Sequence, residues 1–130
     1  MSELINILVK TGQPLEKFIG DLEQLLHLSF QRDSDPIYHD ITYRFTDEQA
    51  RIWVYEREID EEDDSPYEKY PYVINIEARR FKEPEEELAR QRALGYRVFE
   101  TLKKTGKYRL LLFWDMQKLL EKFEPPVGEE

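Results

Sequence analysis

The chain has 130 residues, 40% of them hydrophobic, with a net charge of −9 and no cysteine. Its length predicts one domain with a buried core, and the lack of cysteine excludes disulfides, thiolate nucleophiles and zinc–thiolate sites. The negative charge disfavours nucleic acid and anionic membranes as partners and favours a basic protein. The first residues lack the basic segment of a signal peptide, and no apolar run reaches the roughly 18–20 residues of a membrane helix. We therefore expect a cytoplasmic protein.

The amino-terminal quarter predicts a central strand followed by an amphipathic helix. Residues 4–9 are apolar and rich in β-branched side chains on both faces, which is typical of a strand buried on both sides. From Pro14 to about His27 apolar side chains recur at helical spacing, and proline suits the first helical turn. We expect a structural role for His27, at the end of this helix, rather than a ligand role.

Three segments with alternating polarity follow, at residues 37–45, 51–59 and 72–79. Such alternation is typical of strands with one buried face, and the order predicts an antiparallel meander. In the third segment Tyr72 is expected to belong to the core, since it shares a face with Ile74 and Ile76.

The carboxyl-terminal half predicts a second long helix, a buried strand and a short third helix. Pro84 and neighbouring glutamates favour the start of the long helix. Its core-facing stripe contains Leu88, Gly95, Val98, Phe99 and Leu102, and Gly106 fits a left-handed helix end. The buried strand spans 108–114. Asp115 is a good N-cap for a helix with Met116, Leu119, Leu120 and Phe123 on one side.

These elements predict a β-α-β-β-β-α-β-α order in one domain, residues 1–124, with a tail at 125–130. The expected class is α+β, with an antiparallel-rich sheet and the two long helices packed on one face. A ferredoxin-like arrangement with an added strand would satisfy this order.

An acidic, tyrosine-rich connection lies between the second and third alternating segments. It contains the five carboxylates Asp60, Glu61, Glu62, Asp63 and Asp64, followed by Tyr67 and Tyr70, with Pro66 and Pro71 stiffening the backbone. Tyrosine is enriched at protein interfaces, and carboxylates accelerate association with a cationic protein. We interpret this connection as a candidate binding surface for a basic partner; the alternative is a solvated hairpin tip.

A second candidate surface contains Trp53 and Tyr55, which the alternation directs away from the core. They lie among Arg44, Arg51 and Arg57. Aromatic and arginine side chains on an open sheet can stack nucleic acid bases or a small ligand, but the net charge argues against nucleic acid. The sequence instead favours coverage of this face by the carboxyl-terminal helix or by another subunit, as in a homo-oligomer.

No motif of a nucleotide-binding loop or a serine nucleophile is present, and none implies a cofactor. The best metal-site candidates are Asp33, Asp35, His39 and Asp40, which are oxygen and imidazole ligands close in sequence. Their spacing matches no recognised metal motif. A metal-dependent enzyme built on these residues is the alternative to a non-catalytic protein, which the sequence favours.

Two stretches, Asp63 to Val73 and Leu110 to Leu119, resemble segments of small bacterial proteins that act as immunity partners of secreted toxins. In those proteins an acidic loop similarly precedes an extended strand, and a hydrophobic strand runs into an Asp-x-Gln helix start. The resemblance implies a non-catalytic inhibitor, and it carries over no individual functional residue.

Overall fold

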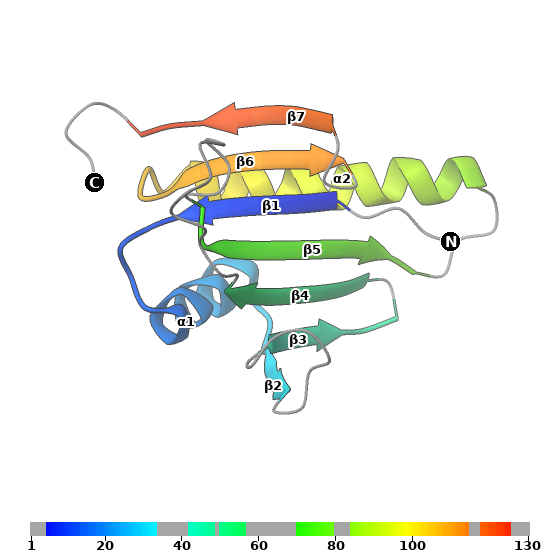
Figure 1. Cartoon of the computed structure of the whole chain (residues 1–130). Coiled ribbons are helices and arrows are strands. Elements are labelled where there is room, and N and C mark those ends of the chain that lie inside the picture. The colour runs from blue at the N-terminus through cyan, green and yellow to red at the C-terminus, as the bar shows by residue number, and fades with distance from the viewer. Residues whose placement is uncertain are drawn as a thin grey trace.

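The computed structural model describes residues 5–33, 42–48, 50–56, 70–79, 84–114 and 118–125. These residues form a seven-stranded antiparallel sheet with two helices packed on one face (Figure 1). The strands are β1 (Ile5–Lys10), β2 (Gln31–Asp33), β3 (Thr42–Thr46), β4 (Ala50–Glu56), β5 (Tyr72–Ala78), β6 (Arg109–Trp114) and β7 (Lys118–Phe123), and the helices are α1 (Leu15–Leu26) and α2 (Pro84–Lys103). The predicted α+β class and antiparallel sheet are confirmed.

The strand order is β2-β3-β4-β5-β1-β6-β7, which places the amino-terminal strand near the middle of the sheet. Ile7 of β1 lies opposite Ile74 of β5 on one side and Leu112 of β6 on the other. Because β5 and β6 are both antiparallel to β1, they run parallel to each other, and α2 connects them across β1. With α1 and α2, the strands β4, β5, β1 and β6 have the order of a ferredoxin-like fold. The sequence predicted one added strand, whereas β2 and β3 extend one edge and β7 extends the other.

The main core lies between the sheet and the two helices. Its buried members are Ile5, Ile7, Val9, Ile52, Val54, Tyr72, Ile74, Ile76, Tyr108, Leu110 and Leu112 from the sheet side, with Phe18, Ile19 and Leu22 of α1 and Val98, Phe99 and Leu102 of α2. The opposite face of the sheet carries a smaller buried cluster of Leu8, Tyr70, Val73, Leu111 and Phe113. Strand β1 contributes to both clusters, as its two-sided apolar pattern predicts.

Helix α2 lies very close to β1 at Gly95. A Cβ atom built on this glycine would lie 2.5 Å from Cγ2 of Ile5, so the lack of a side chain at position 95 allows this close approach. One turn earlier, the buried side chain of Gln91 accepts the backbone N–H of Ala78 through Oε1 at 2.7 Å. The prediction that Leu88 faces the core is wrong, since its residue surface is 45% exposed. The first turns of α2 extend past the end of β1 (Figure 1), so this part of the helix has no central strand beneath it.

Both helices end at residues with left-handed backbone conformation. His27 has φ of 57°, and its backbone N–H donates to the carbonyl oxygen of Glu23. Gly106 follows α2 with φ of 67°, as predicted from its position. The side chain of His27 is exposed, and its backbone forms the cap at the end of α1. Within the described residues, no helix combines the length and apolar character needed to cross a membrane.

The carboxyl-terminal segment forms strand β7 where the sequence predicted a helix. Residues Lys118–Phe123 pair antiparallel with β6, and the register shifts between Leu112 and Phe113. The spacing of Leu119, Leu120 and Phe123 is helical, but the free edge of β6 supplies a row of backbone hydrogen-bond partners that no local pattern reports. The predicted N-cap, Asp115, lies outside the described residues.

Candidate protein-binding site

The acidic connection joins two neighbouring strands at one end of the sheet. Glu56, the last residue of β4, lies opposite Tyr72, the first residue of β5. The connecting residues 57–69, which include Asp60 to Asp64 and Tyr67, lie outside the described part of the structure. In sequence, this segment has seven carboxylates against the basic residues Arg57 and Lys69, which is −5 of the chain's −9. The structure therefore places both ends of a strongly acidic segment on adjacent strands.

Tyr70 is not an exposed contact residue, in contrast to the prediction from sequence. Its residue surface is only 6% exposed, and it packs in the cluster of Leu8, Val73, Leu111 and Phe113 on the sheet face opposite the helices. Burial raises the pKa of its hydroxyl. The ring covers apolar side chains of the central strands, so Tyr70 anchors the end of the acidic connection.

Tyr72 packs on the other side of the sheet and is part of the core, as predicted. Its ring stacks on Phe18 of α1, with centroids 5.3 Å apart and planes inclined by 12°. Its hydroxyl donates a hydrogen bond to the backbone carbonyl of Gln13. The first residue of β5 is thus held by a ring contact and by a hydrogen bond to the β1–α1 turn.

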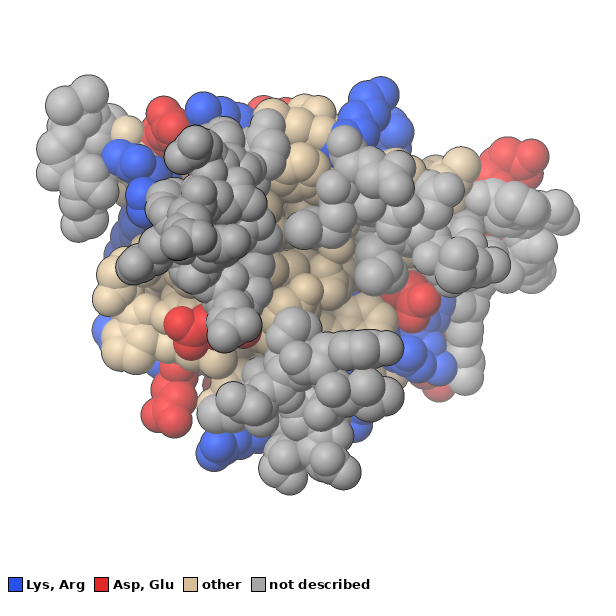
Figure 2. Space-filling model, viewed as in Figure 1, with Lys and Arg blue, Asp and Glu red and all other residues tan. Residues whose placement is uncertain are grey.

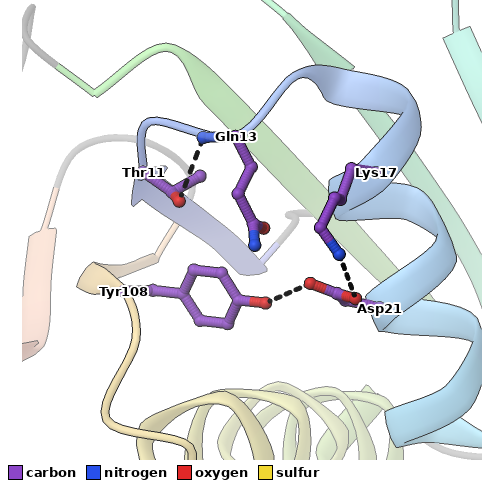
Figure 3. A network of polar contacts seen from close by, with 5 residues as sticks. All are labelled: Thr11, Gln13, Lys17, Asp21 and Tyr108. Atoms are coloured by element: carbon purple, nitrogen blue, oxygen red, sulfur yellow. Dashed lines mark hydrogen bonds and ion pairs between the residues drawn. The ribbon is translucent and has the colours of Figure 1, made fainter.

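A polar network next to this aromatic contact fixes α1 to the start of β6 (Figure 3). The hydroxyl of Tyr108 donates to Oδ2 of Asp21 at 3.1 Å, and Nζ of Lys17 lies 3.8 Å from Oδ1 of the same carboxylate. The ring of Tyr108 also meets Phe18 edge-on at 5.4 Å. Burial, with the nearby Asp21 charge and its hydrogen bond, raises the pKa of Tyr108 well above its usual value. These contacts make the end of the sheet at which β5 begins well packed.

The raised pKa of Tyr108 predicts a loss of stability at alkaline pH. Below the ordinary tyrosine pKa of 10.0 the side chain is neutral in both the folded and the unfolded chain. Its full contribution to the stability of the fold is then present. Above it the unfolded chain releases the proton while the folded chain keeps it, so unfolding becomes more favourable. Tyr108→Phe should cost about 1 kcal/mol at neutral pH, through loss of the hydrogen bond to Asp21.

Denaturant unfolding of Tyr108→Phe and the unchanged protein, at about pH 8 and about pH 11, measures this effect. The stability difference between the two proteins should shrink as the pH rises, because the phenylalanine variant has no hydroxyl to ionise at this position. Equal losses of stability in both proteins would contradict the assignment to Tyr108.

The second predicted surface lies on the sheet face without helices. Trp53 and Tyr55 alternate with buried residues of β4 and are both half-buried. The guanidinium of Arg51 lies 5.5 Å from the Trp53 ring centroid, and Arg44 is the register partner of Trp53 on β3. Tyr55 packs against the smaller buried cluster. The expected coverage of this face by a carboxyl-terminal helix is wrong, because Lys118–Phe123 forms a strand at the sheet edge.

Figure 2 shows the molecule from this side of the sheet. Uncharged residues occupy much of the visible middle, and basic and acidic side chains lie mostly around the margin, with both signs mixed. The described residues in this view therefore form no field of a single sign. The segment 57–69 carries the strongest concentration of one charge in the sequence, so it is the better candidate for electrostatic recognition.

The predicted metal-site residues are mostly outside the described structure. Asp33 is the last residue of the short edge strand β2, while Asp35, His39 and Asp40 lie in the part that is not described. Among the described residues, no three histidine or carboxylate side chains gather closely enough to hold a metal ion. The metal-site hypothesis therefore stays a prediction from sequence.

A cavity that was not predicted from the sequence lies between α2 and the sheet. It lies at the other end of the strands from the acidic connection, where Ala50 is paired with Ala78. Arg90 and Arg97 of α2 contribute to its lining. They are seven residues apart and therefore share one face of the helix, which is the only signal of this site in the sequence.

No protein-family model matches this sequence, and neither a curated protein nor a solved structure matches it.

Proposed function

We propose that this chain is a non-catalytic protein-binding domain whose β4–β5 connection binds a basic partner protein. The observation that carries the proposal is the pairing of Glu56 with Tyr72. It holds the two ends of a segment with a charge of −5 on neighbouring strands of the sheet. Binding residues are often presented in this way, on loops positioned by a rigid scaffold.

The packing of the residues that follow the connection, Tyr70 and Tyr72, supports this function. Tyr72 is fixed by Phe18 and by the carbonyl of Gln13, and Tyr70 is buried on the opposite face of the sheet. A connection with fixed ends loses less conformational freedom when it binds than a free chain does. The carboxylates Asp60 to Asp64 would accelerate encounter with a cationic surface, and Tyr67 would supply an aromatic contact.

The resemblance of Asp63 to Val73 to immunity-type proteins suggests one form of this function. In that form the domain is the inhibitor of a secreted toxin, and the partner is a toxin with a basic surface. Acidic carboxylates facing basic side chains would give the complex a fast association rate that decreases as salt screens the charges.

Neutralising the five carboxylates tests the proposal. The variant changes Asp60, Asp63 and Asp64 to asparagine and Glu61 and Glu62 to glutamine, so the side chains keep their size. A pull-down from the organism's own lysate identifies partners, and the association rate of a captured basic partner is then measured with purified proteins. We expect a decrease of about tenfold or more at low ionic strength, and a smaller difference at high salt.

The matched control removes the same amount of charge from scattered sites. It changes the exposed residues Glu16, Glu48, Glu85, Glu100 and Glu124 to glutamine. The control should bind nearly as fast as the unchanged protein if the position of the charges matters. An acidic-run variant that binds the same partners at the same rate, or a control that weakens binding equally, would rule out the connection as the binding site.

A further inference from the structure

Apolar side chains make up most of the lining of the cavity beside α2. Its volume is about 420 Å³, and its lining includes Phe45 of β3, Ile52 of β4, Ala78 of β5 and Leu94 and Val98 of α2. Small-molecule sites typically measure roughly 300–1,000 Å³ and are lined mainly by hydrophobic side chains. The cavity therefore has the size and the interior of a site for the apolar part of a small ligand.

The rim of this cavity is basic, although the chain as a whole is acidic. Arg90 and Arg97 line it from α2, and His27 lines it from the end of α1. Arg97 is exposed, and Nη1 of Arg90 lies 3.4 Å from Oε1 of Glu86. Of the described residues that line the cavity, Asp47 alone is acidic.

Asp47 has a structural role in the turn between β3 and β4 through both its side chain and its backbone. Its Oδ1 accepts the backbone N–H of Ala50 at 2.8 Å, and its backbone carbonyl accepts a hydrogen bond from Nη1 of Arg79 at 2.6 Å. The lining residues that the structure describes thus carry the guanidinium groups of Arg90 and Arg97 against the carboxylate of Asp47, and the neighbouring Arg79 and Glu86 add one charge of each sign. This local balance is opposite in sign to the net charge of −9.

We propose that this cavity binds a small organic carboxylate with an apolar body, such as a medium-chain fatty acid. The apolar body would occupy the interior between Ile52 and Leu94, where its transfer from water is favourable. The carboxylate would lie at the rim and accept hydrogen bonds from Arg97 and Arg90, because guanidinium groups match carboxylates in both charge and geometry. This site is separate from the acidic connection, which lies at the other end of β4 and β5.

Calorimetric titration with decanoate, below the concentration at which it forms micelles, tests the proposal. Decanol, which has the same chain without a charge, and acetate, which has the charge without the chain, are titrated under the same conditions. We expect decanoate to bind at one site per chain and the two comparison compounds to bind at least tenfold more weakly. Decanol that binds as tightly as decanoate, or no detectable binding of decanoate, would overturn the proposal.

Three variants locate the site. Arg97→Gln should weaken decanoate binding by about tenfold or more, because it removes a charge-assisted hydrogen bond. Ala93→Trp should abolish binding by filling the cavity from an exposed lining position. Arg92→Gln is the matched control, since Arg92 is also exposed on α2 but lies over the Trp114 ring. Equal effects of the two arginine changes, or full binding by Ala93→Trp, would place the ligand elsewhere and overturn the proposal.

Discussion

Replacing Gly95 by alanine is expected to destabilise the protein by about 1–3 kcal/mol, although alanine is the better helix former. The new Cβ atom would lie 2.5 Å from Cγ2 of Ile5 and 3.2 Å from its Cβ. Ile5 is fully buried on β1, between β5 and β6, so it has little space into which to move. Relief of the overlap would require α2 to move away from the sheet and would loosen the packing of Val98 and Phe99.

Gly20→Ala in α1 is the matched control for this prediction. A Cβ atom at Gly20 meets nothing within 4 Å, so the helix preference of alanine should stabilise the protein by up to about 1 kcal/mol. Denaturant unfolding of the two variants should therefore give changes of opposite sign. In the double variant Ile5→Ala/Gly95→Ala, the combined loss should be smaller than the sum of the single losses. Equal stabilisation by both glycine changes would contradict the close contact.

Phe18→Ala is expected to cost about 3–5 kcal/mol of stability, which is a large fraction of the total for a domain of this size. The ring of Phe18 is fully buried and contacts both Tyr72 and Tyr108. Its removal would leave a cavity among α1, β5 and the start of β6, and two ring contacts would be lost with it.

Phe123→Ala makes the same chemical change at a half-buried position on β7. We expect it to cost less than half as much as Phe18→Ala, because less of the ring is removed from water on folding. Equilibrium unfolding in guanidinium chloride measures both losses. If the two variants lost equal stability, the aromatic contacts at Phe18 would not be central to the fold.

Much of the fold could be predicted because burial on one or two faces leaves a local signal in sequence. Alternation identified β5 around Ile74 and Ile76, the two-sided apolar run identified β1, and helical spacing identified α1 and most of α2. Gly106 was also interpreted correctly, because a left-handed turn favours glycine for a local reason, and Gly95 was correctly assigned to the core-facing side of α2.

The errors in the fold concern features that depend on distant parts of the chain. Strand β7 exists because the edge of β6 is open to it, and the helical spacing of Leu119, Leu120 and Phe123 contains no information about that edge. Leu88 continues the apolar stripe of α2, but the helix extends past β1 at that point. Both features are set by the lengths and positions of neighbouring elements.

The candidate site was predicted in part. The acidic connection and the core position of Tyr72 follow from composition and alternation, whereas Tyr70 was assigned to the candidate binding surface and is buried. The cavity was missed because arginines such as Arg90 and Arg97 on an exposed helix face usually indicate only a solvated surface. Its interior depends on where α1 ends relative to β3 and β4, which a sequence pattern does not report.

The central position of β1 has a consequence for the synthesis of this protein on the ribosome. Asn6 of β1 hydrogen-bonds Asn75 of β5, 69 residues later in the chain, and the other neighbour of β1 is the still later strand β6. At about 5–20 residues per second, the nascent strand waits on the order of ten seconds for its first partner. During that time an apolar, β-branched segment has both edges unpaired and is prone to pair with other chains. Chaperones that bind short apolar segments near the ribosome exit should therefore recognise residues 5–10 during this interval.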